Sequence, residues 1–126
     1  AGPMTLIPHD IQELGVTVHK RVEDAIEGAD VVDVLRIQLE RQDKAMFPTP
    51  REYARIYGVN EERMKLAKPD CLVMHPGPMN RGLEISWDTG YSDQAVIREQ
   101  VTNGVAVRMA VLFLTIMGGK PVENAN

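Results

Sequence analysis

Two short apolar runs, separated by segments that carry helix start and stop signals, constrain the fold of this chain most strongly. The runs cover residues 31–35 and 71–74. Continuous apolar runs of this length are typical of strands that are buried on both faces of a parallel sheet. Strands that alternate with helices form such sheets. The sequence therefore predicts an α/β fold in which a largely parallel sheet is flanked by helices.

Capping residues mark the expected helix boundaries. Thr49 has the chemistry of an N-cap, Pro50 suits the first helical position, and Glu52 completes a capping box. Gly58 marks the end of this helix, and Asn60 can cap the next one. In chain order we expect helix 8–14, strand 16–19, helix 23–27, strand 31–35, helix 50–58, helix 60–68, strand 71–74 and a long helix from residue 92 to a stop at residues 118–119.

Composition and charge limit the class of protein. The chain has 126 residues, of which 44% are apolar and 25% are charged, and these values suit one compact domain. Its single cysteine, Cys71, cannot form an internal disulfide framework, so we expect a reducing compartment and a cytoplasmic location. The net charge of −4 argues against a general nucleic-acid-binding or anionic-membrane surface.

No membrane or targeting segment is expected. The longest apolar stretch, residues 105–117, contains Arg108 and is shorter than the roughly 20 residues that cross a bilayer. The first residues, Ala1, Gly2 and Pro3, lack the charged and apolar regions of a signal peptide. Because the chain starts without a methionine, we also expect a fragment or a processed protein.

Charged and amide side chains follow the first buried run. Arg36, Gln38 and Glu40 share one face if the segment is extended, and Arg36 and Glu40 are neighbours if it is helical. A guanidinium that a carboxylate orients can bind a small carboxylate ligand, and Gln38 can add a donor. Ligands bind beyond the carboxyl ends of strands in open α/β sheets, which favours a site here. The same residues also fit a solvated loop or a structural salt bridge.

A proline- and glycine-rich loop follows the second buried run. Pro76, Gly77 and Pro78 restrict the backbone around a residue that permits close approach. The prolines lack N–H groups, so the carbonyl groups of this loop are natural acceptors for the amide or amine donors of a ligand. An ordinary rigid turn explains the same residues. If the two strands are neighbours, this loop meets Arg36 at one edge of the sheet.

Three side chains around this loop have two interpretations each. His75 fits a general acid or base, and it also fits a structural hydrogen-bonding role. Arg81 and Glu84 fit either a ligand-binding pair or a loop salt bridge. The three histidines and one cysteine show no metal-ligand spacing, and glycine-rich phosphate loops and Gly-x-Ser-x-Gly elbows are absent from the sequence.

Three motifs resemble the aspartate carbamoyltransferases, and the resemblance extends over nearly the whole chain. They are HPGPMNRGLEI at 75–85, RIQLER at 36–41 and NGVAVRMAVL at 103–112. The segments at 5–18 and 47–58 also resemble bacterial members. The related ornithine enzymes typically have His-Cys-Leu-Pro where this chain has a proline, Pro76.

The resemblance implies a two-domain enzyme of pyrimidine biosynthesis, of which residues 1–126 form the C-terminal aspartate-binding domain, truncated at its N-terminus. By the family pattern, Arg36 and Gln38 bind the side-chain carboxylate of L-aspartate, and Glu40 orients Arg36. The backbone carbonyls of Pro76 and Gly77 face the carbamoyl NH2 group and the aspartate amine.

The remaining implied roles are supporting ones. Arg41 and Glu84 match family positions associated with domain closure and loop bracing. The implied reaction transfers the carbamoyl group of carbamoyl phosphate to the aspartate amine, releases phosphate, and requires no cofactor or metal.

The carbamoyl-phosphate domain is absent from this sequence, as are its Ser-Thr-Arg-Thr-Arg and His-Pro-Thr-Gln motifs. We therefore expect the isolated chain to be inactive and to need the missing N-terminal domain, in an enzyme that is a homotrimer when intact. Two alternatives remain open. One is a non-catalytic binding or assembly module of the same family, and the other is a carbamoyltransferase with a different amine acceptor.

Overall fold

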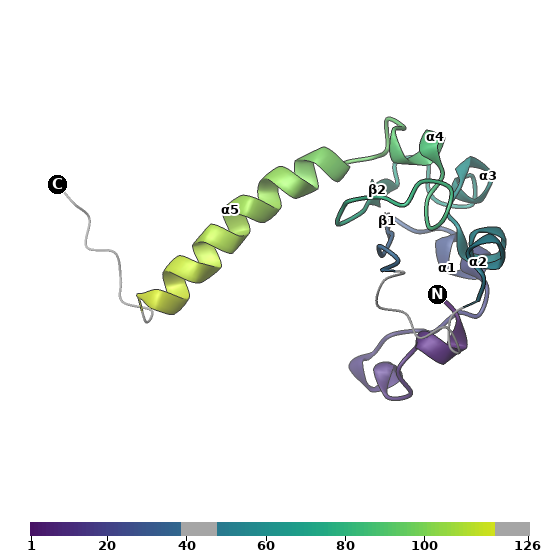
Figure 1. Cartoon of the computed structure of the whole chain (residues 1–126), viewed down its shortest axis with the longest axis horizontal. Helices are drawn as coiled ribbons and strands as arrows, with labels where there is room; N and C mark the ends of the chain where they lie inside the picture. Colours follow the sequence, from purple (N-terminus) through teal and green to yellow (C-terminus); the bar gives the residue numbers. More distant parts are fainter. Residues whose placement is uncertain (39–47, 118–126) are drawn as a thin grey trace.

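The computed structural model describes residues 1–38 and 48–117, which form one compact body and one long helix that extends away from it (Figure 1). The elements are the 3-10 helices η1 (Met4–Leu6) and η2 (Ile11–Leu14), then α1 (Val22–Ile26), β1 (Val31–Asp33), α2 (Pro50–Tyr57), α3 (Glu61–Met64), β2 (Leu72–Met74), α4 (Trp87–Gly90) and α5 (Ile97–Ile116). This arrangement confirms the expected α/β fold with a parallel sheet and helices.

The sheet has two parallel strands among the described residues, with β1 beside β2. The register places Val32 opposite Val73 and Asp33 opposite Met74. On the other side of β2, the N–H of Val73 donates to the carbonyl of Gln94 over 2.8 Å, and the N–H of Val96 donates to the carbonyl of Val73 over 3.0 Å. Because the pair is parallel, both strands end at the same edge, where residues 36–38 and 75–78 follow them.

The core lies between the sheet and the short helices. It joins side chains from α1, α3 and both strands, together with residues 59 and 85, which form an isolated parallel bridge. Its buried members are Val22, Ile26, Val34, Val59, Met64, Cys71, Val73 and Ile85. Burial of Cys71 was expected from the apolar run in which it lies, and burial also raises the pKa of its thiol.

Helix capping follows the sequence closely. The N–H of Glu52 donates to the hydroxyl oxygen of Thr49 over 3.2 Å, Pro50 occupies the first helical turn, and Gly58 directly follows Tyr57, the last residue of α2. The N–H of Arg63 donates to the side-chain oxygen of Asn60 over 3.0 Å. Both caps that the sequence predicts are therefore confirmed.

Three predicted helices differ from the structure, two of them because backbone groups pair with distant partners. The helix after Asn60 ends at Met64 and does not reach Lys68, since the carbonyl of Leu66 accepts from Gly28 and the N–H of Lys68 donates to Ala29. The long helix starts at Ile97 and not at residue 92, since residues 94–96 pair with β2. The helix expected at 8–14 is the 3-10 turn η2, although it does end at the left-handed Gly15.

The strand predicted at residues 16–19 is also wrong. These residues lie outside any helix or strand, and residues 16 and 17 are exposed. A strand depends on a partner and on a buried face, and this segment has neither in the part of the chain that the structure describes. The predicted helix stop at residues 118–119 lies outside the described residues.

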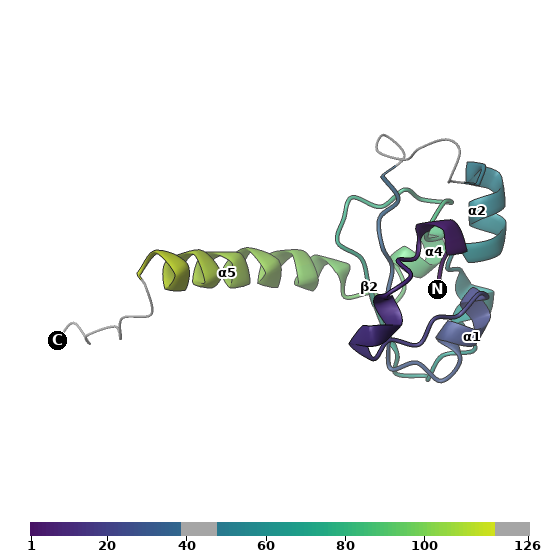
Figure 2. The same cartoon turned by 90° about the horizontal axis from the view of Figure 1, so that it is seen from below.

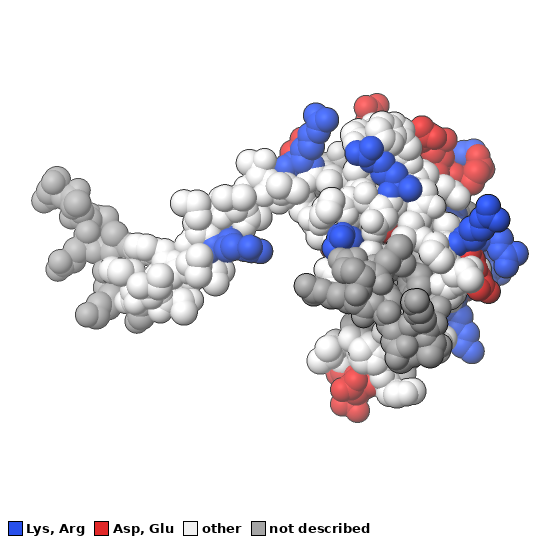
Figure 3. Space-filling model, in the orientation of Figure 1, with Lys and Arg blue, Asp and Glu red and all other residues white. Residues whose placement is uncertain are grey.

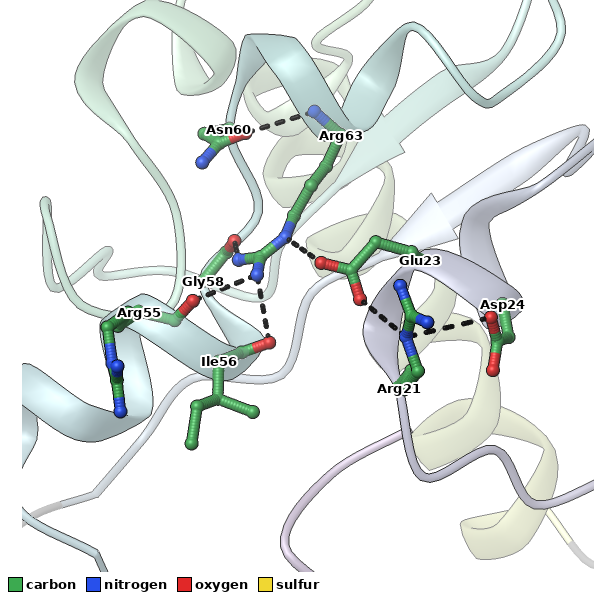
Figure 4. A network of polar contacts seen from close by, with 8 residues as sticks. All are labelled: Arg21, Glu23, Asp24, Arg55, Ile56, Gly58, Asn60 and Arg63. Atoms are coloured by element: carbon green, nitrogen blue, oxygen red, sulfur yellow. Dashed lines mark hydrogen bonds and ion pairs between the residues drawn. The ribbon is translucent and has the colours of Figure 1, made fainter.

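The side chain of Arg63 joins three helices (Figure 4). Its Nε donates to the Glu23 carboxylate of α1 over 2.9 Å, and its terminal nitrogens donate to the carbonyls of Arg55, Ile56 and Gly58 at the end of α2. A helix leaves its last carbonyls without intrahelical partners, and a guanidinium with five donors suits several of them at once. Arg63 therefore caps α2 and anchors α1 and α3 to it.

Helix α5 extends from the compact body as a single arm, as the two perpendicular views show (Figures 1 and 2). Every residue from 101 to 117 is exposed, including Val105, Met109 and Leu112. Most of its surface in Figure 3 is uncharged, whereas the charged side chains gather on the compact body. A helix that is apolar all round is normally buried in a larger protein.

None of the helices among the described residues is both long enough and apolar enough to cross a bilayer.

Gly58 generates a prediction about stability, because a side chain has no room there. A Cβ atom at this position would lie 2.5 Å from the Ala54 carbonyl oxygen and 2.8 Å from that of Leu83. We expect Gly58→Ala to lower the free energy of unfolding by about 2 kcal/mol, as measured by urea denaturation. Gly104→Ala is the control, since a Cβ there meets nothing within 4 Å and alanine favours a helix by about 1 kcal/mol. Equal midpoints for the two variants would contradict this account.

Glu23 generates a prediction about pH. A hydrogen bond with its own backbone, together with the hydrogen bond and charge of Arg63, holds the pKa of Glu23 below its ordinary value of 4.5. A lowered pKa contributes stability above pH 4.5 that is lost as the pH falls through the folded-state pKa. We expect Glu23→Gln to abolish this part of the acid destabilisation, about 1 kcal/mol, in denaturation curves compared between neutral pH and acid pH.

Asp24→Asn is the matched control, because the Asp24 side chain is exposed and its Oδ1 lies 4.0 Å from Nε of Arg21, which is too far for a hydrogen bond. Its stability should fall with pH in parallel with the wild type. If Glu23→Gln also runs parallel to the wild type, the Arg63 contact does not contribute to acid sensitivity.

Candidate functional site

The structure brings the two predicted loops together at one edge of the sheet. Leu35, Arg36 and Gln38, which follow β1, and Pro76 and Gly77, which follow β2, line one hollow of about 330 Å³. Arg36 and Gln38 are half-buried, and so is Gly77. This hollow combines a guanidinium, a side-chain amide and a loop rich in backbone acceptors. The arrangement can bind a small molecule that carries both a carboxylate and N–H donors.

The shape of the second loop depends on Gly77. Its φ of 66° lies in the left-handed region, which a residue with a side chain rarely adopts. In this conformation the N–H of Gly77 donates to Nδ1 of His75 over 2.8 Å. Pro76 and Pro78 lie on either side and have no N–H of their own. The loop is therefore held from inside by His75.

His75 and Glu84 form a buried pair beneath this loop. Both side chains are at most 1% exposed, and Nε2 of His75 lies 3.1 Å from Oε1 of Glu84. Because Nδ1 accepts from Gly77, the ring proton sits on Nε2 and is donated to Glu84. Both ring nitrogens are occupied, so this geometry favours the structural role for His75 over the acid–base role.

Asn80 connects the buried pair to the first loop. Its N–H donates to Oε1 of Glu84 over 2.6 Å, and its side-chain nitrogen donates to Oε2 of Glu84 over 3.1 Å and to the carbonyl of Ile37 over 2.7 Å. The sequence analysis missed this residue, because its contact with Ile37 spans 43 positions. It also missed Gln100 of α5, whose side-chain oxygen accepts from the N–H of His75 over 2.8 Å.

Arg81 and Glu84 do not form the pair that the sequence suggested. The Glu84 carboxylate faces Asn80 and His75. The Arg81 guanidinium lies 4.2 Å from the centre of the Trp87 ring and donates to the Tyr91 hydroxyl over 3.0 Å. Arg81 is thus part of an exposed aromatic cluster and does not line the hollow. The two remaining predicted residues, Glu40 and Arg41, lie outside the described residues.

A second hollow, of about 380 Å³, lies beside β1 and α1 and is lined mostly by apolar side chains. Its polar members include Tyr53 and Glu84. Burial, with a contribution from the Glu84 charge, raises the pKa of Tyr53 to about 12, so its phenol stays neutral at physiological pH. Since the described residues that line this hollow include no Lys or Arg, the hollow beside Arg36 is the better candidate for an anionic ligand.

In the part of the chain that the structure describes, no three His, Cys, Asp or Glu side chains lie close enough together to hold a metal ion.

Comparisons with known proteins agree on one family. Residues 8–115 match the family described as aspartate/ornithine carbamoyltransferase, Asp/Orn binding domain. The chain is 63% identical over 118 residues to the aspartate carbamoyltransferase catalytic subunit of Heliobacterium modesticaldum and 58% identical over 119 residues to that of Desulforamulus reducens. Each match covers 94% of this chain and 38% of the relative, so the chain spans less than half the length of these relatives.

Solved structures give the same fold. Aspartate transcarbamoylase from Trypanosoma cruzi, in complex with carbamoyl phosphate, matches with a TM-score of 0.69 and 29% identity over 88% of this chain and 38% of that one. Ornithine carbamoyltransferase from Pyrococcus furiosus matches with a TM-score of 0.63 and 30% identity over 80% of this chain and 32% of that one.

The buried Glu84 carboxylate generates a prediction about the integrity of the site. Glu84→Ala would leave donors of His75 and Asn80 buried without their acceptor, and we expect a loss of about 3 kcal/mol in the free energy of unfolding. Chemical denaturation followed by circular dichroism measures this loss. Glu62→Ala is the control, since its side chain is 80% exposed and should cost less than about 0.5 kcal/mol. A similar small effect for both variants would show that the Glu84 network does not hold the loop.

Proposed function

Because this chain belongs to the aspartate/ornithine carbamoyltransferase family, we propose that it is the aspartate-binding part of an aspartate carbamoyltransferase. The proposed reaction transfers the carbamoyl group of carbamoyl phosphate to L-aspartate and forms N-carbamoyl-L-aspartate and phosphate, a step of pyrimidine biosynthesis. The observation that carries the proposal is the single hollow that Arg36 and Gln38 share with Pro76 and Gly77. The names of the relatives that are 56–63% identical support it.

The charge of the hollow favours aspartate over ornithine as the amine acceptor. Arg36 can form paired hydrogen bonds with the side-chain carboxylate of aspartate, and Gln38 can donate a further one. The side chain of ornithine ends in an ammonium group, which a guanidinium repels. Position 76 is a proline here, whereas the ornithine enzymes typically have a cysteine, and this difference also favours aspartate as the acceptor.

In the proposed reaction, the α-amine of aspartate attacks the carbamoyl carbon. The C–N bond forms through a tetrahedral intermediate, the C–O bond to phosphate breaks, and the amine loses one proton. The carbonyl groups of Pro76 and Gly77 accept hydrogen bonds from the amine and from the carbamoyl NH2 group. Most of the catalysis is positioning of two anions, and orientation alone can supply roughly 7 to 11 kcal/mol of barrier reduction. Arg36 and Gln38 contribute by holding the aspartate side chain in place.

The proposal also requires a second domain, which binds carbamoyl phosphate. Carbamoyl phosphate needs a cationic site, and the described hollow offers one guanidinium, which we assign to aspartate. We propose that residues 1–126 are the C-terminal aspartate-binding domain, that an N-terminal carbamoyl-phosphate domain completes the site, and that this chain alone is inactive. The apolar side chains exposed on α5 support the presence of such a partner, because a large apolar surface is unfavourable in water and is normally covered by another part of the protein. A homotrimeric assembly and a cytoplasmic location belong to the same proposal.

Complementation tests this proposal directly. This chain is mixed with a separately produced carbamoyl-phosphate domain from the same family, and the formation of carbamoyl aspartate is measured, with each part alone as the control. Activity in the mixture alone supports the proposal. Activity of this chain alone would contradict the incomplete site, and a mixture that stays inactive would favour a non-catalytic module. Supplying ornithine and other amines in place of aspartate identifies the acceptor.

Arg36→Ala tests the proposed ligand contact within this assay. We expect the KM for aspartate to rise by at least about thirtyfold, which corresponds to roughly 2 kcal/mol, whereas the KM for carbamoyl phosphate changes little. Arg51→Ala is the matched control, because Arg51 is exposed on α2 and distant in sequence from both loops. An unchanged aspartate dependence in Arg36→Ala would exclude the assigned role.

A further inference from the structure

We infer that Asn80 is a positioning residue that holds the two loops of the candidate site at their working distance. The Asn80 side chain donates hydrogen bonds both to the first loop, at the Ile37 carbonyl, and to the buried Glu84 carboxylate beneath the second loop. The inference deepens the proposed function and rests on it, because the two loops are those assigned to aspartate.

The bridge starts next to the residues assigned to the ligand. Ile37 lies between Arg36 and Gln38 in the chain, and it is 6% exposed in a small core with Tyr53 and Leu83. The Asn80 side chain donates to the Ile37 carbonyl over 2.7 Å. Arg36 and Gln38 flank this residue, so a shift of the Ile37 peptide changes the direction of both side chains.

The bridge ends beneath the acceptor loop. Glu84 accepts from Asn80 at both carboxylate oxygens and from His75 at one of them, and His75 accepts from the N–H of Gly77. Each link is between 2.6 and 3.1 Å long. A continuous chain of hydrogen bonds therefore runs from the Ile37 carbonyl through Asn80 and Glu84 to the Gly77 peptide. Buried networks of this kind are rigid when every member has its partner.

The amide group of Asn80 suits this position for a specific reason. Its NH2 group has two protons, and one is donated to the Ile37 carbonyl and the other to the Glu84 carboxylate. Aspartate has nearly the same size and shape but has no proton to donate when ionised, and its charge would face that of Glu84. Asn80→Asp therefore removes both hydrogen bonds donated by the side chain without creating a cavity.

Three variants separate the bridge from general stability. Asn80→Asp breaks both contacts. Asn60→Asp is the matched control, because it makes the same chemical change at the N-cap of α3, where aspartate caps as well as asparagine does. The double variant, Asn80→Asp combined with Glu84→Gln, restores a donor and acceptor pair between positions 80 and 84, since the introduced amide can donate to the introduced carboxylate. It does not restore the donor to the Ile37 carbonyl.

The experiment is an NMR titration of this chain with L-aspartate, with the midpoint of thermal unfolding measured on each variant. We expect Asn80→Asp to shift the backbone amide signals of residues 36–38 and to weaken aspartate binding by about tenfold, with Asn60→Asp within about twofold of the wild type. The double variant should regain most of the unfolding midpoint while its aspartate binding stays weak.

Two outcomes would overturn the inference. One is wild-type aspartate binding in Asn80→Asp, and the other is a double variant that regains binding together with stability, which would reduce Asn80 to a brace of the second loop. If the wild-type chain itself shows no response to aspartate, the isolated chain lacks a competent aspartate site, and the complementation assay decides the proposed function separately. The bridge is then decided by the amide signals of residues 36–38, which must move in Asn80→Asp and not in Asn60→Asp.

Discussion

Hydrogen bonds between β1 and β2 hold Val32 opposite Val73 in a parallel pair, and the candidate site follows from this register. Parallel strands end at the same edge, so the chain emerges twice beside one hollow, first with Arg36 and Gln38 and then with Pro76 and Gly77. A slip of one residue would turn every side chain of the strand to the opposite face of the sheet. Val73 is also paired with residues 94–96, so β2 is bonded on both sides and has little freedom to slip.

Around this pair, the half-buried Arg63 and the buried Glu84 perform different tasks. Arg63 satisfies carbonyls at the end of α2 and the Glu23 carboxylate, and so it joins the helices that cover the sheet. Glu84 accepts from Asn80 and His75 and holds the loop that follows β2. The first network supports the scaffold and the second supports the site. They meet through the bridge between residues 59 and 85, because the Val59 N–H donates to the Glu84 carbonyl.

Sequence reasoning succeeded where the deciding interaction is local. The Thr49 and Asn60 caps lie three residues from the N–H groups that they accept from, so their spacing is visible in the sequence. It failed where a distant partner decides, as at residues 66–68, which pair with Gly28 and Ala29. Spacing alone also left Arg36 open between a ligand site and a salt bridge, and the family resemblance supplied its assigned role. Asn80 could not be found, because its partner Ile37 is 43 positions away.

The two hydrogen bonds of the His75 ring run in one direction, from the Gly77 peptide through the imidazole to the Glu84 carboxylate. The Gly77 N–H donates to Nδ1, and Nε2 donates to Glu84, so the imidazole occupies one tautomer within a proton-ordered chain. To pass a proton along, the ring would have to gain one at Nδ1, where a backbone N–H already points. Because both of its ring nitrogens are engaged, the imidazole does not transfer protons between the loop and Glu84. A proton released in the hollow therefore has no route through this ring into the interior beneath the loop.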